Sequence, residues 1–371
     1  MECRNCHKET GGEVLVDLGM QPLANSLWNG KDVMEPRYPL APVICKNWHC
    51  RLIQLPELSP GIEPFGSDYP YRSGQSEEWK NHLRRLLVRA GVHAGDHVLD
   101  VGGNDGTLGR LTPLGVEYVS VDPSSTWPDI SAPMTRRFGE MVGEWADHIF
   151  ALNVAAHVPD LDDFFAGIHA ALKPTGQLVV EVQDVNRLIE RGEWDCIYHE
   201  HYSYFNKQTL FDALERRGFF VLHSEELSTH GGSIRAYARK HDIDTVPLRI
   251  MKPYPKWPPT DGLSTQAGMC LQWANEGRRV VGYGAPAKAM TWLNSYGVKL
   301  AYIVDGTPEK QGKYTPGSHI EISSPRRLEA QCRLGKTPPD IVVILAWNWK
   351  DEILPKIPAG PEVWCRGERL R

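Results

Sequence analysis

The chain has 371 residues, 41% of them hydrophobic and 23% charged, with a formal net charge of -5 and a pI near 6.3. This length and composition predict a globular protein of two or three domains. The negative net charge excludes a protein whose main function is to bind nucleic acid, because phosphate binding requires a positive surface. The sequence contains no apolar run long enough to span a membrane and no apolar signal core, so we expect a cytoplasmic protein without membrane partners.

Residues 1–62 are irregular and predict a zinc-binding module. Two short-spaced pairs of cysteines lie here: Cys3, Cys6, Cys45 and Cys50. In a reducing compartment we expect metal ligands rather than disulfides, and tetrahedral zinc takes four thiolates. His7 and His49 are possible substitutes for a cysteine, and unmetallated cysteines are the alternative. Four thiolates leave no open position, so the expected zinc is structural.

Residues 63–250 alternate helical and strand patterns. Apolar side chains at helical spacing predict a helix over residues 79–90, and a second helix is expected at Leu161–Leu172. Short apolar runs predict four strands, at His97–Val101, Tyr118–Asp122, His148–Leu152 and Leu178–Val182. Strands separated by helices indicate a mostly parallel sheet.

The first of these strands runs into a glycine-rich turn that spans residues 102–106. Glycine lets the backbone approach a ligand closely, and Asp100 and Asp105 bring negative charge to the turn. That charge suits the cationic sulfonium and ammonium groups of S-adenosylmethionine better than a pyrophosphate. The next strand ends in Asp122, where a carboxylate can bind both ribose hydroxyls. A tight turn without a ligand is the alternative.

Polar residues gather in two later segments. Asn153 and His157 flank the end of a strand, and Tyr198-His199-Glu200-His201 places a phenol, a carboxylate and two imidazoles together. A neutral imidazole can remove a proton near pH 7, and a neighbouring carboxylate can orient it and stabilise its cation. By itself this cluster also fits a metal site or a solvated surface loop.

A proline-rich stretch at residues 253–259 predicts a connection, after which the α/β rhythm restarts. We expect a helix at Leu263–Glu276, a strand at Arg279–Gly284 and a helix that opens near Pro286. Two more strands are expected at Leu300–Asp305 and Asp340–Ala346. Residues 251–371 therefore predict a smaller, second Rossmann-like domain.

Several motifs follow one another through almost the whole chain. After the cysteine module they are Gln21-Pro22-Leu23-Ala24-Asn25, Tyr71-x-Ser73, Gly103-Asn104-Asp105-Gly106-Thr107, Asn153-x3-His157-Val158-Pro159-Asp160, Tyr198-His199-Glu200-His201-x-Ser203-Tyr204-Phe205, Thr229-His230-Gly231-Gly232-Ser233 and Gly282-Tyr283-Gly284-Ala285-Pro286-Ala287-Lys288. This order resembles the sugar C-methyltransferase family, which methylates C3 of nucleotide-linked 4-keto-deoxysugars. The resemblance implies a Rossmann-like α/β domain that binds S-adenosylmethionine, an N-terminal zinc-binding module and a C-terminal second Rossmann-like domain that binds the nucleotide.

The resemblance also implies roles for single residues. His201 would be the base that removes the C3 proton, and the groups that hold the sugar and stabilise the enolate would be Tyr198, Glu200, Asn153 and His157. Residues that would bind or close over the cofactor are Gly102, Asn104, Asp105, Asp122, Tyr71 and Ser73. Lys288 is a candidate diphosphate contact, since lysine and a helix N-terminus both favour phosphate. His230 is expected in the sugar pocket or in a turn.

The sequence departs from the family pattern at three places. The second cysteine pair has two extra residues, the text between Asp122 and Phe138 is short for a helix, and Ala289 stands where a glycine commonly follows the lysine. A C-methyltransferase for a non-sugar ketone and a zinc-containing, non-catalytic scaffold are the alternatives. We expect a monomer or a homodimer.

Overall fold

The computed structural model describes residues 1–9, 11–30, 32–56, 73–123, 134–241, 249–335 and 337–371. The chain forms two compact units, and both are discontinuous in sequence. The first unit comprises Met1–Val16, Pro42–Val185 and His201–Pro253, and the second comprises Asp17–Ala41, Asn186–Glu200 and Tyr254–Arg371. The division of the sequence at residues 62 and 250 stays a prediction. In the described part of the chain, no helix is both long and apolar enough to cross a membrane.

The first unit is built on a six-stranded sheet with the strand order β10-β11-β8-β7-β5-β6. Its strands are β5 (His97–Val101), β6 (Glu117–Val121), β7 (Ala146–Leu152), β8 (Leu172–Gln183), β10 (Phe219–Leu227) and β11 (Ser233–Lys240). β6, β5, β7 and β8 pair in parallel, while β11 and β10 run antiparallel. The mostly parallel sheet expected from the sequence is confirmed, and the antiparallel pair adds an edge that the sequence patterns do not predict.

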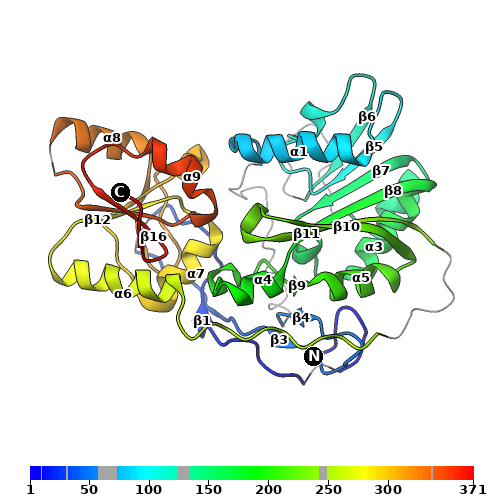
Figure 1. Cartoon of the computed structure of the whole chain (residues 1–371), viewed down its shortest axis with the longest axis horizontal. Coiled ribbons are helices and arrows are strands. Elements are labelled where there is room, and N and C mark those ends of the chain that lie inside the picture. The colour runs from blue at the N-terminus through cyan, green and yellow to red at the C-terminus, as the bar shows by residue number, and fades with distance from the viewer. Residues whose placement is uncertain (10, 31, 57–72, 124–133, 242–248, 336) are drawn as a thin grey trace. The chain divides into compact units, whose positions relative to one another are not determined.

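Helices cover both faces of this sheet. α1 (Glu77–Ala90) lies on one side, and α3 (Leu161–Ala171) and α5 (Lys207–Glu215) lie on the other (Figure 1). α1 begins where the Ser76 side chain accepts the N–H of Trp79, and it ends at Gly91 in the left-handed conformation. α2 (Arg136–Val142) packs closely on α3, since a Cβ on Gly139 would lie 2.0 Å from the carbonyl oxygen of Gly167.

The cysteine module belongs to the first unit and shares its core. A small sheet pairs β3 (Val43–Ile44) with β4 (Ile53–Gln54), and β4 with β9 (Ser203–Tyr204). Three of the module's cysteines and Leu52 join the same buried cluster as Phe205 and Leu210. The module is therefore packed onto the larger sheet domain rather than tethered beside it.

The second unit contains another six-stranded sheet, in the order β14-β13-β12-β15-β16-β17. The strands are β12 (Val280–Tyr283), β13 (Ile303–Val304), β14 (Ile322–Ser323), β15 (Ile341–Ile344), β16 (Glu362–Cys365) and the antiparallel β17 (Glu368–Arg369). β12 and β15 are buried along their whole length, as parallel strands covered on two faces must be. The strand order reverses between them, which makes this a doubly wound, Rossmann-like sheet, as the sequence predicts.

In this unit α6 (Gly262–Asn275) and α7 (Ala287–Tyr296) lie on one face of the sheet, and α8 (Pro325–Leu334) and α9 (Lys350–Ile353) lie on the other (Figure 1). The short strands β1 (Met20–Gln21) and β2 (Tyr38–Pro39) pair with each other in the same unit. α4 (Val185–Glu190) follows β8 and leads into the segment Asn186–Glu200, which packs with the second unit.

Candidate active site and zinc centre

The sulfurs of the four N-terminal cysteines come together in one cluster. Cys3 Sγ lies 3.7 Å from Cys50 Sγ, Cys6 Sγ lies 3.7 Å from Cys45 Sγ, and all four lie within 4.8 Å of one another. A tetrahedral zinc site with bonds of about 2.3 Å has sulfur–sulfur edges of about 3.8 Å. The cluster therefore fits one zinc ion with four thiolate ligands.

Tight turns present these sulfurs. The residues that directly follow the second cysteine of each pair, His7 and Arg51, adopt left-handed backbone with φ of 58° and 55°. The His7 side chain lies 2.8 Å from Asp162, and His49 Nδ1 donates to the carbonyl of Arg249 at 2.8 Å. Both histidines that could replace a cysteine are thus engaged elsewhere, which favours the four-cysteine ligand set.

Asn5 links the cysteine cluster to the sheet domain. Its side chain is almost fully buried, and Asn5 Nδ2 lies 3.5 Å from Cys50 Sγ and donates to Asp212 in α5 at 2.7 Å. Arg217 donates to Asn5 Oδ1 at 2.8 Å. Groups that hold a metal ligand in this way fix its orientation. The sequence patterns do not predict this link, because it depends on residues far apart in the chain.

The glycine turn after β5 gathers carboxylates at the ends of two neighbouring strands. Gly102 has a φ of 73°, and a Cβ there would lie 2.3 Å from Val154 Cγ2. Asp122, after β6, accepts the N–H of Asn104 at 2.9 Å, and Asp100 accepts the Tyr118 hydroxyl at 2.7 Å. Two carboxylates beside closely approaching backbone fit the cationic and ribose groups of S-adenosylmethionine.

Asn104 and Asp105 also hold the chain segment that precedes α1. Asn104 Oδ1 accepts the N–H of Ser73 at 3.1 Å, and Asp105 Oδ2 accepts the N–H of Gly74 at 2.9 Å. Ser73 therefore lies beside the turn, and its contact with the cofactor stays a prediction. Tyr71 lies outside the described residues, as does most of the short stretch after Asp122. Direct contact of Asn104 and Asp105 with the cofactor stays a prediction.

His157 and His201 lie together in the first unit although they are far apart in sequence. His157 ends the short 3-10 helix Ala155–His157 that follows β7, and its ring centroid is 4.4 Å from that of His201. The N–H of Tyr202 donates to the carbonyl of Ala156 at 2.8 Å, which fixes the two segments against each other. His201 is only 8% exposed. The expected base and an expected partner thus share one location.

This pair adjoins the glycine turn that follows β5. Asn153 follows β7 with a φ of 58°, and its N–H donates to the carbonyl of Glu181 at 2.7 Å. Asparagine tolerates this left-handed conformation better than most residues. The next residue, Val154, packs against Gly102. The strand end that carries Asn153 and leads to His157 is therefore in contact with the turn expected to bind the cofactor.

Tyr198 and Glu200 belong to the second unit, where Glu200 is 1% exposed. Glu200 Oε1 accepts the N–H of Asn25 at 2.9 Å, and burial raises the pKa of Glu200. His199 Nε2 donates to the carbonyl of Pro39 at 3.2 Å, and burial lowers the pKa of His199. His199, to which the sequence assigns no role, thus anchors backbone.

A buried ionic cluster surrounds Glu181 of β8, and the sequence patterns do not predict it. Glu181 is fully buried, and its Oε2 accepts from Arg235 Nη2 at 2.9 Å and lies 3.0 Å from His82 Nε2. Burial acts to raise the pKa of Glu181, but His82 and Arg235 outweigh it and hold that pKa below its usual range. Glu181 Oε1 accepts the Thr229 hydroxyl at 3.3 Å. A charged residue inside an apolar strand is the sequence signal for such a cluster.

Of the two expected substrate contacts, the structure describes the side chain of Lys288. Lys288, in the first turn of α7, is 8% exposed, and its Nζ donates to Asn348 Oδ1 at 2.6 Å. Burial lowers the pKa of Lys288. His230 lies in the 3-10 turn Thr229–Gly231, and its side chain is outside the described part of the structure. Contacts of both residues with substrate stay predictions.

Three protein-family models match successive parts of the chain. Their descriptions are "Putative zinc binding domain" for residues 3–63, "Methyltransferase domain" for residues 71–224 and "C-methyltransferase C-terminal domain" for residues 265–360. C-methyltransferase NovU of Streptomyces niveus is 29% identical over 395 residues, which cover 95% of this chain and 91% of that protein. The protein is a C-methyltransferase.

Solved methyltransferases resemble part of this C-methyltransferase. The 1,6-didemethyltoxoflavin-N1-methyltransferase of Burkholderia thailandensis is 18% identical, with 54% of this chain and 99% of that chain covered and a TM-score of 0.36. Phosphoethanolamine N-methyltransferase 2 of Haemonchus contortus, solved with S-adenosylmethionine, is 15% identical, with 44% and 53% covered and a TM-score of 0.35. The cofactors of the C-methyltransferase are S-adenosylmethionine and a structural zinc ion.

Proposed function

We propose that the protein methylates the carbon next to a ketone, C3 of a nucleotide-linked 4-keto-deoxysugar, with His201 as the base. The observation that carries the proposal is the distance of 4.4 Å between the His157 and His201 rings. These rings follow the strand end whose Val154 packs against Gly102, which supports a proton acceptor near the turn proposed to bind the cofactor. The ordered motifs of the sugar C-methyltransferases support the choice of a sugar nucleotide over other ketones.

The chemistry needs a base and a group that stabilises negative charge. The 4-keto group acidifies the C3–H bond, the His201 imidazole takes that proton, and the electron pair passes into an enolate with its charge on O4. Hydrogen-bond donors at O4 then stabilise that charge. Asn153 offers a side-chain amide and Tyr198 a phenol for this task. The raised pKa of Glu200 favours its protonated carboxyl, which can also donate.

His157 has a role through its closeness to His201. The two ring centroids are 4.4 Å apart, so His157 packs against His201 and limits the positions that the His201 ring can take. S-adenosylmethionine, when bound, supplies the electrophilic methyl group that the enolate carbon attacks. Holding both reactants in one site supplies much of the remaining acceleration.

The test is incubation with a cofactor that carries a labelled methyl group and with dTDP-, GDP- and CDP-linked 4-keto-deoxysugars in deuterated buffer. Mass spectrometry should show a methylated sugar nucleotide, and His201→Ala should reduce the rate about 100-fold to 10,000-fold, the usual worth of a general base. His93→Ala is the matched control, because His93 is an exposed histidine in the loop between α1 and β5.

Each component of the proposal can fail separately in this assay. Methyl transfer that His201→Ala leaves intact would remove His201 as the base. Cofactor binding without methylation of any sugar would remove the sugar substrate and favour another ketone.

A further inference from the structure

The segment Glu193–Glu200 leads directly into His201, and it is buried although most of it is irregular. It contains the 3-10 helix Trp194–Cys196, and Asp195, Ile197 and Glu200 are all at most 1% exposed. Buried irregular backbone keeps one conformation only where other groups satisfy its polar atoms. The partners that do so here come from two parts of the second unit.

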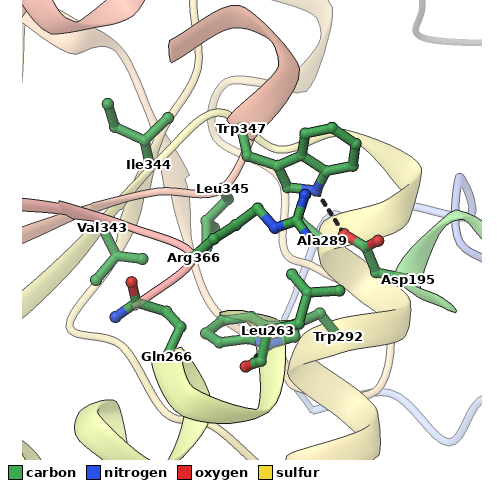
Figure 2. Close-up of a pocket in the computed structure, with 10 residues that line it drawn as sticks. All are labelled: Asp195, Leu263, Gln266, Ala289, Trp292, Val343, Ile344, Leu345, Trp347 and Arg366. Atoms are coloured by element: carbon green, nitrogen blue, oxygen red, sulfur yellow. Dashed lines mark hydrogen bonds between the residues drawn. The ribbon is translucent and has the colours of Figure 1, made fainter. Parts of the chain in front are cut away.

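The C-terminal sheet domain binds the beginning of the segment. Trp347 Nε1, after β15, donates to Asp195 Oδ2 at 2.8 Å (Figure 2). The Thr291 hydroxyl in α7 donates to the carbonyl of Ile197 at 3.0 Å. Arg366 also donates to Glu193 at 2.9 Å. Three elements of one Rossmann-like domain therefore hold the segment at three places.

The residues Asp17–Ala41 bind its end. The backbone N–H of Asn25 donates to Glu200, and His199 donates to the carbonyl of Pro39. The carboxyl of Glu200 is thus held directly, and the backbone just before it is held through His199. Hydrogen bonds therefore hold the residues on both sides of Tyr198: Ile197 before it, and His199 and Glu200 after it.

Trp347 itself has little freedom to move. Lys288 Nζ lies 3.4 Å from the centroid of the Trp347 ring, a cation–π contact, and is held there by Asn348. The cavity that Trp347, Asp195 and Arg366 help to line has a volume of about 20 Å³ (Figure 2). Such a space holds about one water molecule. The ring that donates to Asp195 is therefore fixed by packing and by charge.

We propose that Asp195 and Trp347 are positioning residues for methyl transfer. Their hydrogen bond holds Glu193–Glu200 so that Tyr198 and Glu200 keep the orientation that the reaction needs. The inference rests on the proposed function for the roles of Tyr198 and Glu200. Asp195 and Trp347 act through this segment and not on the substrate. Such a device matters because a misplacement of about 1 Å can cost about 100-fold in rate.

Two substitutions isolate the hydrogen bond. Trp347→Phe keeps an aromatic ring beside Lys288 but removes the N–H that Asp195 accepts, whereas Asp195→Asn keeps an acceptor for Trp347. Trp364→Phe is the matched control, because its Nε1 donates to Glu362 at 3.2 Å in β16 rather than to the segment. The measurements on the full-length protein are kcat, KM for both substrates, and hydrogen exchange of the amides of residues 193–200.

In Trp347→Phe we expect kcat to fall about 10-fold to 100-fold while both KM values stay within about twofold. The amides of residues 193–200 should exchange about 10-fold faster, and those of β5 and β7 should not change. Asp195→Asn should stay close to the wild type, and Asp195→Ala should match Trp347→Phe.

A kcat of Trp347→Phe equal to that of Trp364→Phe overturns the inference. Exchange that rises throughout the second unit also overturns it, because that result indicates a general loss of stability. If the wild type methylates no sugar, the proposed function fails, and the exchange data decide the anchoring alone. Acceleration confined to residues 193–200 then supports it, and unchanged exchange rejects it.

Discussion

Two glycine turns in this chain share one hydrogen-bond pattern, in which an aspartate after the next strand accepts a backbone N–H of the turn. The two turns differ in the charges around that aspartate. In the first unit, Asp122 at the end of β6 accepts the N–H of Asn104 at 2.9 Å. In the second unit, Asp305 at the end of β13 accepts the N–H of Ala285 at 2.6 Å. Lys310 contacts this second turn from the 3-10 helix Pro308–Lys310: it is 6% exposed, donates to the carbonyl of Ala285 at 2.8 Å and lies 3.9 Å from Asp305.

The difference shows how one supersecondary motif can serve two purposes. The first turn brings Asp100 and Asp122 to neighbouring strand ends, where negative charge suits a cationic cofactor. In the second turn the Asp305 carboxylate is neutralised by Lys310 of the same unit. Its charge therefore stabilises the turn itself. A carboxylate after the second strand is therefore insufficient evidence of a nucleotide site, and the surrounding charges decide its use.

Removal of zinc should have the largest effect, and it should destabilise the first unit but not the second. Binding of a structural zinc ion contributes about 10 kcal/mol or more to folding in small zinc modules, and here the cysteines share the core of the first unit. Cys50→Ala should lose the metal and speed hydrogen exchange in β3, β4 and the adjoining core, but not in β12 and β15. Metal analysis and exchange mass spectrometry measure this, with Cys332→Ala in α8 as the control. Retained zinc in Cys50→Ala would contradict the four-cysteine site.

Loss of the lysine should damage only the second turn. Lys310→Met leaves the Asp305 carboxylate buried without its cation, and breaking a buried pair in this way costs about 3 kcal/mol or more. The double variant Lys310→Met/Asp305→Asn should recover part of this stability, because no charge is left behind. Exchange of the β12 and β13 amides reports the free energy of opening. Effects that simply add would show that the two residues are not coupled.

A second buried carboxyl makes the stability of this unit depend on pH. Burial raises the pKa of Glu193 to about 7, although Arg366 opposes the shift. Between the unfolded value near 4.5 and about 7 the folded protein keeps a proton that the unfolded chain releases. Rising pH therefore removes stability across this window, by about 3 kcal/mol once the pH exceeds 8.

Glu193→Gln tests this dependence, because the amide resembles the protonated acid at every pH. Thermal unfolding of the wild type and of this variant should nearly coincide at pH 5, and the variant should be the more stable at pH 8.5. Glu190→Gln is the control, since Glu190 is about half exposed in α4. A constant difference between the variant and the wild type at all pH values would assign the effect to packing.

Local patterns predict the parallel strands because continuous apolar runs have few other uses, and β5 has the predicted bounds, His97–Val101. β10 is not predicted, since it is an edge strand with Phe220 and Leu222 about half exposed, and its strand conformation depends on pairing with β11. The cysteine cluster follows from spacing. The Glu181 cluster and the anchoring of Glu200 by Asn25 depend on long-range contacts, which no local pattern contains.

The smallest expected effect is the most direct comparison of the two turns. Asp122→Asn keeps an acceptor for the N–H of Asn104 and so preserves the turn, but it removes the charge that is proposed to bind the cofactor. A hydrogen bond to a charged group is worth about 1 kcal/mol more than a neutral one, so affinity for S-adenosylmethionine should fall about fivefold. Asp305→Asn makes the same change in the second turn and should leave that affinity unchanged. Calorimetric titration of both variants with S-adenosylmethionine measures these affinities. Equal affinities of the two variants would mean that the charge of Asp122 stabilises the turn, as that of Asp305 does. The cofactor would then be bound by the backbone and by Asp100.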